Sequence, residues 1–248
     1  GNTSYGKGEE LTCTFTATGG GGSSGTILYM PMNGNLDVYG NLKDALAKGK
    51  AYSEMDWGVS DWTPEFAEGV FSEEQALSFV KGPVDDEGYP LEPPYYKYVD
   101  LPVSGRFCAT DFTWDFWLYC DSRHNNPGYY SDVIGFNENG YIYGLRTSDG
   151  FETMEFYFSS IGYVRLPPVR DAWNHVAVTR VGDSISFYIN GEKQAEKNKI
   201  NVYAYCMQVG MSNHESSFKI AHVRVLNHAL WTENFTPPTK ESYAAYMG

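Results

Sequence analysis

The stretch FTWDFWLY, from Phe112 to Tyr119, places a large apolar side chain at every second position. Side chains of a β-strand point to opposite faces in turn, so these residues share one face while Thr113 and Asp115 lie on the other. The residues of the apolar face are Phe112, Trp114, Phe116 and Leu118. The stretch therefore predicts a strand with one face in a core.

The same alternation recurs downstream, between residues 153 and 190. The predicted inward residues are Met154, Phe156, Phe158, Ile185, Phe187 and Ile189. The predicted outward residues are Glu155, Tyr157, Ser184, Ser186 and Tyr188. Asn190-Gly191 then predicts a two-residue type I′ hairpin. Because the second half shows no helix-length amphipathic pattern, we expect an all-β fold, a two-sheet antiparallel β-sandwich of the jelly-roll kind.

The chain of 248 residues is long enough for one large all-β domain. Residues 1–25 are expected to form an N-terminal arm or linker that ends in the Gly-rich run Gly19–Gly25, and residues 26–248 the sandwich. Leu11–Thr18 alternates like a strand, and Ile27–Met32 reads as a second strand. An irregular insertion is expected at about 41–74, with a short helical piece at Leu42–Ala47.

The composition of the chain excludes some classes of binding partner. The formal net charge is -13, the pI is about 4.7, and no run of Lys or Arg offsets that charge. Nucleic acid and anionic membrane surfaces are therefore excluded as expected partners, and no apolar stretch reaches the roughly 20 residues of a membrane-spanning helix. The four cysteines lack a Cys-x-x-Cys spacing, so buried thiols are favoured over a disulfide or a zinc site. They are Cys13, Cys108, Cys120 and Cys206.

Two segments carry a family resemblance. The run DAWNHVAVTR, from Asp171 to Arg180, followed by ISFYING, from Ile185 to Gly191, resembles the laminin-G-like, pentraxin-like jelly rolls of the concanavalin A-like lectin and glucanase superfamily. The resemblance covers roughly residues 26 to 240 and implies a concanavalin A-like sandwich. That superfamily uses the fold for sugar binding, adhesion, calcium-dependent recognition and, in some branches, glycan hydrolysis.

The segment ALWTENFTPP, from Ala229 to Pro238, is similar to the closing motif of such domains in bacteriophage tail and fibre proteins. Related domains also occur in surface proteins of gut bacteria. The resemblance thus implies an extracellular setting, either a bacterial cell surface or a virion.

Carboxylate spacing gives no support for catalysis. The enzyme branch of the superfamily carries a Glu-x-Asp-x-x-Glu strand motif, which this sequence lacks. Glu152 and Glu155 would face opposite sides of a strand, and Asp111 and Asp115 would lie roughly 13 Å apart, too far for a glycosidase pair. Asp111 and Asp115 are interpreted as solvent-facing carboxylates. The five histidines show no zinc spacing, and His175 is expected to be a packed sheet residue.

Calcium is the metal that the sequence favours most, because oxygen ligands are plentiful and related domains often hold one ion. Asn33-Gly-Asn-Leu-Asp37 and the acidic cluster at Asp85 are the candidate sites, with Asp37 ahead of Asp85. A solvated turn is the alternative for each.

Aromatic side chains in predicted loops are the candidate ligand-binding residues, since flat rings pack against the apolar faces of pyranoses. The candidates are Trp57, Trp62, Tyr95, Tyr96, Tyr129 and Tyr130. Each pair could instead form a lid over the sandwich edge.

The sequence therefore predicts a noncatalytic module that recognises a cell-surface or dietary glycan through aromatics at one edge or on a sheet face. One alternative is a structural or adhesive component of a phage tail or bacterial surface assembly that binds protein. Another is a glycan hydrolase with an unrecognised site.

Overall fold

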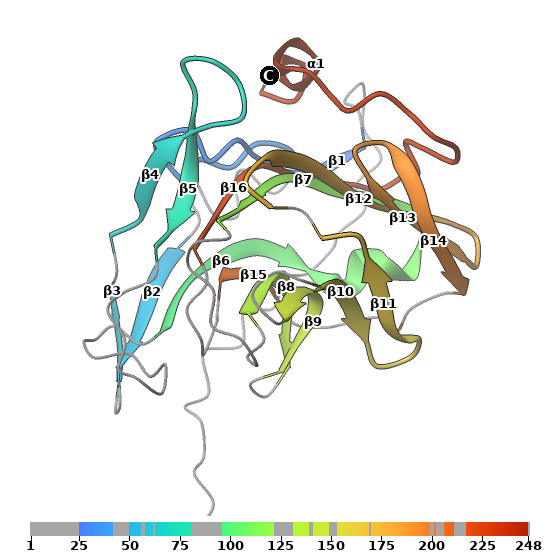
Figure 1. Cartoon of the computed structure of the whole chain (residues 1–248), viewed down its shortest axis with the longest axis horizontal. Helices are drawn as coiled ribbons and strands as arrows, with labels where there is room; N and C mark the ends of the chain where they lie inside the picture. The colour runs from blue at the N-terminus through green and yellow to red at the C-terminus, as the bar shows by residue number, and fades with distance from the viewer. Residues whose placement is uncertain are drawn as a thin grey trace, which may run out of the picture.

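Two antiparallel sheets of eight strands each stack face to face as a β-sandwich (Figure 1). The computed structural model describes residues 25–41, 50–55, 58–61, 63–80, 96–121, 131–138, 141–148, 153–168, 170–198, 201, 206–210 and 217–247. The all-β, two-sheet antiparallel architecture expected from the sequence is confirmed. The expected N-terminal arm up to residue 24 and the helical piece at Leu42–Ala47 lie outside the described residues.

The first sheet is centred on the strand that opened the sequence analysis. Its order is β14 (Glu192–Asn198), β13 (Ser184–Ile189), β12 (Trp173–Val181), β7 (Phe112–Cys120), β16 (Phe218–Leu226), β5 (Gln75–Phe79) and β4 (Glu65–Glu68). β1 (Thr26–Met30) also pairs with β16. β5 pairs with residues 218–220 of β16 and β1 with residues 223–226, so the two strands share one edge of β16 in succession.

The second sheet lies below the first in Figure 1. Its order is β11 (Gly162–Leu166), β10 (Thr153–Phe158), β9 (Tyr141–Ser148), β8 (Ser131–Glu138), β15 (Cys206–Gly210), β6 (Tyr96–Ser104), β2 (Lys50–Met55) and β3 (Gly58–Asp61). A 3-10 helix at Gly105–Ala109 follows β6, and the short helix α1 (Lys240–Ala244) lies over the first sheet. In the described part of the chain, no helix is long and apolar enough to cross a membrane.

The stretch at about 41–74 differs from its expected irregular character. It carries β2, β3 and β4, and each of these strands is hydrogen-bonded into one of the sheets. Period-2 alternation failed to reveal them because they are only four to six residues long, and two of them lie at sheet edges, where one face need not be apolar.

The core forms as the alternation predicts. Every residue expected to point inward from β7, β10 and β13 is buried, and each of those from β7 is at most 1% exposed. The Trp114 ring from the first sheet lies 5.8 Å from Phe136 and 5.7 Å from Phe156 of the second. These contacts across the layers join the two sheets.

The hairpin between β13 and β14 is also confirmed. Asn190 and Gly191 have φ angles of 51° and 80°, the left-handed pair that a type I′ turn requires. The C-terminal segment passes so close to this turn that a Cβ on Gly191 would collide with the carbonyl oxygen of Phe235.

Several residues predicted to face outward on the first sheet are nevertheless buried. Asp115 and Tyr188 are both 0% exposed. They do lie on the face opposite the core, but the C-terminal segment after β16 returns across that face (Figure 1). The interpretation of Asp115 as a solvent-facing carboxylate is therefore wrong, while Asp111 is exposed and accepts a hydrogen bond from the Gly182 N–H at 2.8 Å.

Candidate functional site

Most of the predicted ligand-binding aromatics lie outside the described residues. These are Trp57, Trp62, Tyr95, Tyr129 and Tyr130. Tyr96 is the first residue of β6, but only its backbone is described. The structure therefore leaves the proposed role of these six residues as a prediction.

Of the two candidate calcium sites, the one at Asp37 lies within the described residues. Asp37 is partly exposed, and its backbone N–H donates to Asn35 Oδ1 at 3.0 Å, as in a solvated Asx turn. Asp85 lies outside the described residues. Within the described ranges, no group of three or more His, Cys, Asp or Glu side chains is arranged to hold a metal ion.

A buried ionic cluster lies between the first sheet and the C-terminal segment. Asp115 accepts hydrogen bonds from Arg224 Nε at 2.9 Å and Nη2 at 3.0 Å, and its Oδ2 lies 2.9 Å from His175 Nε2. Burial acts to raise the pKa of Asp115, but Arg224 and His175 outweigh burial and lower it. Tyr243 of α1 donates to the same carboxylate at 3.4 Å.

A His–Asp pair can orient a catalytic base, but this one is sealed from substrate. Both side chains are 0% exposed. The rings of Trp231 and Phe235 stand edge-on to His175 at 5.6 and 5.7 Å and cover it. The expectation of a packed sheet histidine is confirmed, and the cluster fastens the C-terminal segment to the sheet.

A second buried group joins β1, β16 and the turn before β5. His222 has a left-handed φ of 53° at a bulge in β16, and its Nδ1 and Nε2 lie 2.8 Å from Tyr29 Oη and 2.9 Å from Glu74 Oε2. Burial lowers the pKa of His222. Lys240 of α1 lies 3.5 Å from Glu74 Oε1. These contacts also hold α1 in place, beside a cavity of about 520 Å³.

The outer face of the second sheet is different in character, because aromatic and ionic side chains there reach solvent. We call the group formed by Asp132, Arg146, Glu155, Tyr157 and Tyr163 the tyrosine face. Strand pairing brings its members together, since Asp132 is opposite Arg146, Arg146 opposite Glu155, and Tyr157 opposite Tyr163. Tyr163 is 52% exposed.

Arg146 organises the tyrosine face. Its Nη2 lies 2.8 Å from Glu155 Oε1, and its guanidinium carbon lies 4.6 Å from the centre of the Tyr163 ring and 5.2 Å from that of Tyr157. The two rings stack at 4.7 Å. Such contacts hold the side chains in one arrangement before any ligand arrives.

Asp132 is the group of this face whose ionisation is most perturbed. Burial raises the pKa of its carboxyl to about 7, although the nearby Arg146 acts to lower it. A carboxyl that is half ionised near neutral pH and partly exposed can either donate or accept a hydrogen bond.

Polar groups continue across the sheet from the tyrosine face. Tyr157 is opposite Gly144, Gly144 opposite Gly135, and Gly135 opposite Gln208. Gln208 Nε2 donates to Asp100 Oδ1 at 2.6 Å. The two glycines carry no side chain and are buried, and they separate the rings of β10 and β11 from the amide and carboxylate of β15 and β6.

Sequence reasoning identified part of this site. Alternation placed Glu155 and Tyr157 on the outward face, which the pairing of β10 confirms. Asp132, Arg146 and Tyr163 were missed, because their proximity depends on which strands are neighbours. The signal that could have found them is the turn spacing that makes β9, β10 and β11 successive hairpin partners.

Two described cysteines match their expected state. Cys108 and Cys120 are buried free thiols, and burial raises the pKa of both. Cys13 lies outside the described residues, and the side chain of Cys206 is likewise not described.

Comparison with known proteins agrees with the architecture. Residues 94–234, more than half of the chain, match a family model described as concanavalin A-like lectin/glucanases superfamily. No curated protein gives a significant match.

Solved structures with a similar fold include a neurotoxin binding domain and a sialidase. The binding domain of botulinum neurotoxin DC, in a complex with rat synaptotagmin II, has a TM-score of 0.54 and 13% identity, over 84% of this chain and 49% of that one. A Trypanosoma rangeli sialidase has a TM-score of 0.53 and 13% identity, over 90% of this chain and 34% of that one. The chain spans half or less of each, and at this identity the likeness concerns the fold alone.

Proposed function

Because the chain belongs to the concanavalin A-like lectin/glucanases superfamily, we propose that it is a noncatalytic recognition module that binds a glycan on the tyrosine face. The observation that carries the proposal is the half-exposed Tyr163 ring, ordered by Arg146 beside the carboxylates of Asp132 and Glu155. Sugar sites combine an apolar ring with a few fixed polar groups in this way.

The dimensions of the face suit a chain of sugars. β10 and β15 are separated by β9 and β8, so Tyr157 and Gln208 are roughly 14 Å apart at the usual spacing between strands. An oligosaccharide could pack one pyranose on the tyrosine rings and extend over Gly144 and Gly135 toward Gln208. Its hydroxyls would then meet the carboxylate and amide groups at both ends.

We propose binding rather than cleavage because the carboxylates of the tyrosine face do not form the acid and base pair of a glycosidase. The Glu155 side chain is 6% exposed and its carboxylate accepts a hydrogen bond from Arg146 Nε at 2.9 Å, so it is engaged within the protein and closed to a substrate. Asp132 is the one carboxyl of the tyrosine face whose pKa is raised as in a general acid, and a glycosidase needs a second carboxylate across the sugar. The module would operate outside a cell, on a bacterial surface or a virion.

The test is a glycan array followed by calorimetric titration of any glycan that binds. Tyr163→Ala should weaken binding about tenfold or more, since an exposed anchor ring is worth about 1.4 kcal/mol or more. Asp132→Asn should also weaken it. Val181→Ala and Asp183→Asn are the matched controls, because both residues are exposed and belong to the β12–β13 hairpin of the other sheet.

Three outcomes separate the alternatives. A glycan signal lost in Tyr163→Ala but kept in both controls supports the proposal. A blank array with a co-purifying protein partner favours the adhesive role in a surface or tail assembly. Release of reducing ends from a bound glycan favours a hydrolase.

A further inference from the structure

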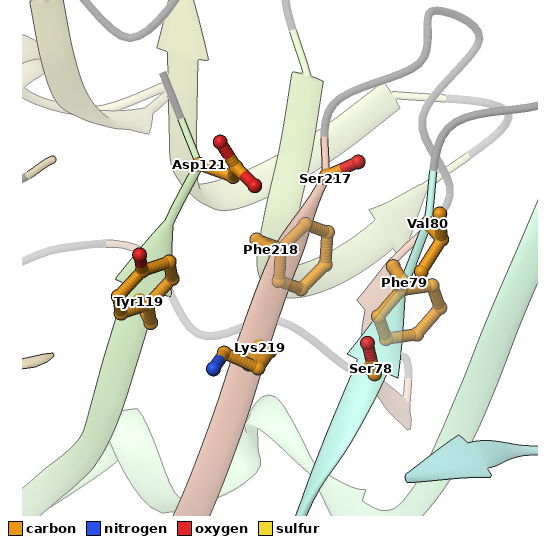
Figure 2. A pocket seen from close by; sticks show the side chains of 8 residues that line it. All are labelled: Ser78, Phe79, Val80, Tyr119, Asp121, Ser217, Phe218 and Lys219. Atoms are coloured by element: carbon orange, nitrogen blue, oxygen red, sulfur yellow. The ribbon is translucent and has the colours of Figure 1, made fainter. Parts of the chain in front are cut away.

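A separate hollow of about 220 Å³ lies on the first sheet, toward the start of β16. Figure 2 shows its lining side chains, which come from the ends of β5, β7 and β16. They are Ser78, Phe79, Val80, Tyr119, Asp121, Ser217, Phe218 and Lys219. The C-terminal segment that seals Asp115 contributes no residue to this lining, and the tyrosine face belongs to the other sheet.

Strand pairing places the polar residues of the hollow in one row. Trp173 of β12 is opposite Tyr119 of β7, Tyr119 is opposite Lys219 of β16, and Lys219 is opposite Ser78 of β5. Paired residues point to the same side of a sheet. The row therefore brings two aromatic rings, an ammonium and a hydroxyl together on the outer face.

Among the described residues, aromatic rings and a carbonyl oxygen hold the Lys219 ammonium. Its Nζ lies 4.3 Å from the centre of the Tyr119 ring and 5.4 Å from that of Trp173, and it donates to the Glu68 carbonyl oxygen at 3.3 Å. No carboxylate of the described residues forms an ion pair with it. In a chain of net charge -13 such a lysine is unusual, because acidic partners outnumber basic ones.

Lys193 differs from Lys219 in having a carboxylate partner. Lys193 lies 5.8 Å from the centre of the Tyr188 ring, yet its Nζ is also 2.9 Å from Glu196 Oε2. Lys219 has the ring contacts and the Glu68 carbonyl, and no carboxylate of the described ranges pairs with it. An ammonium that rings and a carbonyl hold in a hollow is an ordered positive charge that an anionic group can still approach.

The other end of the hollow has the opposite chemistry. Asp121 and Ser217 lie there, with the Asp121 N–H donating to the Ser217 carbonyl at 3.0 Å. A carboxylate beside a hydroxyl suits a ligand that brings hydroxyl donors, and it disfavours a compact anion such as phosphate. Val80, which also lines the hollow, is 50% exposed and adds an apolar side chain, whereas the Phe79 and Phe218 rings stack at 4.6 Å in the core beneath.

We propose that this hollow binds one carboxylated monosaccharide unit, such as a hexuronic acid. The sugar carboxylate pairs with Lys219, the ring hydroxyls donate to Asp121 and Ser217, and the C–H face packs against Val80. The volume suits one sugar rather than a chain, since pockets for drug-sized ligands are larger, about 300–1,000 Å³. The negative charge of the whole protein acts weakly here, because charges beyond about 8 Å are screened at physiological salt.

The test is to titrate the full chain with D-glucuronate and, separately, with D-glucose. Binding is monitored through the chemical shifts of the backbone amides. Glucuronate should shift amides near Ser78, Tyr119 and Lys219 and bind at least about tenfold more tightly than glucose, the difference expected for one charge-assisted pair. Lys219→Met should remove that preference. Lys193→Met, the matched control, should keep it.

Several results would overturn the inference. They are equal binding of glucose and glucuronate to the wild type, an unchanged preference in Lys219→Met, or shifts confined to another surface. The comparison of the two sugars needs no variant, so a folding defect in Lys219→Met leaves the test intact. Tyr163→Ala should not affect glucuronate binding, which separates failure of this site from failure of the tyrosine face.

Discussion

Replacing Asp115 with alanine should strongly destabilise the protein. The change deletes two hydrogen bonds to Arg224 and one to His175, and it leaves a guanidinium side chain that is only 2% exposed without its counter-charge. Removing one partner of a buried ion pair costs about 3–5 kcal/mol, against a typical total stability of about 5–15 kcal/mol. At about 2–4 °C per kcal/mol for a chain of this size, the melting temperature should fall by about 6–20 °C.

Urea unfolding followed by tryptophan fluorescence measures this loss directly. Asp111→Ala is the matched control, because Asp111 precedes the same strand but is exposed, and it should cost under about 1 kcal/mol. A loss under about 1 kcal/mol in Asp115→Ala would instead mean that Arg224 reaches solvent once the carboxylate is gone. The C-terminal segment would then not seal the sheet.

Three further results are expected. Gly191→Ala should lower the unfolding free energy by about 1–3 kcal/mol, because its Cβ collides with the Phe235 carbonyl and its φ is left-handed; a melt equal to wild type would contradict the close approach. Burial raises the pKa of Asp132 to about 7, so ionisation of this group costs stability above that pH, and its contribution should improve as pH falls from about 8 to 5. Asp132→Asn should abolish that slope in pH-dependent urea midpoints. Cys108 and Cys120, buried with raised thiol pKa values, should resist maleimide until urea unfolds the chain, as peptide mass mapping can show.

The core could be read from the sequence because burial in a sandwich follows local alternation. Phe112, Trp114 and Phe156 point inward from their strands as the period of two predicts. Whether the opposite face of a strand is exposed or covered could not be predicted from this alternation. Asp115 has the pattern of a solvent-facing residue, and it is buried because Phe235 and Tyr243, more than a hundred residues later, cover its sheet.

In the candidate site, too, the orientation of a residue within its strand was predictable, but its neighbours on other strands were not. Tyr157 was placed correctly on the outward face by its own strand. Its neighbours Arg146 and Asp132 lie on different strands, and their meeting depends on sheet order and on a register shift in β8 between Asp132 and Ile134. A bulge of this kind re-aims one side chain without an obvious mark in a single sequence.

Hydrogen–deuterium exchange of the wild-type protein, with and without the best glycan from the array, shows whether glycan binds on the tyrosine face. We expect slower amide exchange in β8, β9, β10 and β11, which carry the tyrosine face, when a neutral oligosaccharide is bound. Unchanged exchange in these four strands, with protection elsewhere in the chain, would contradict the assignment of glycan recognition to this face.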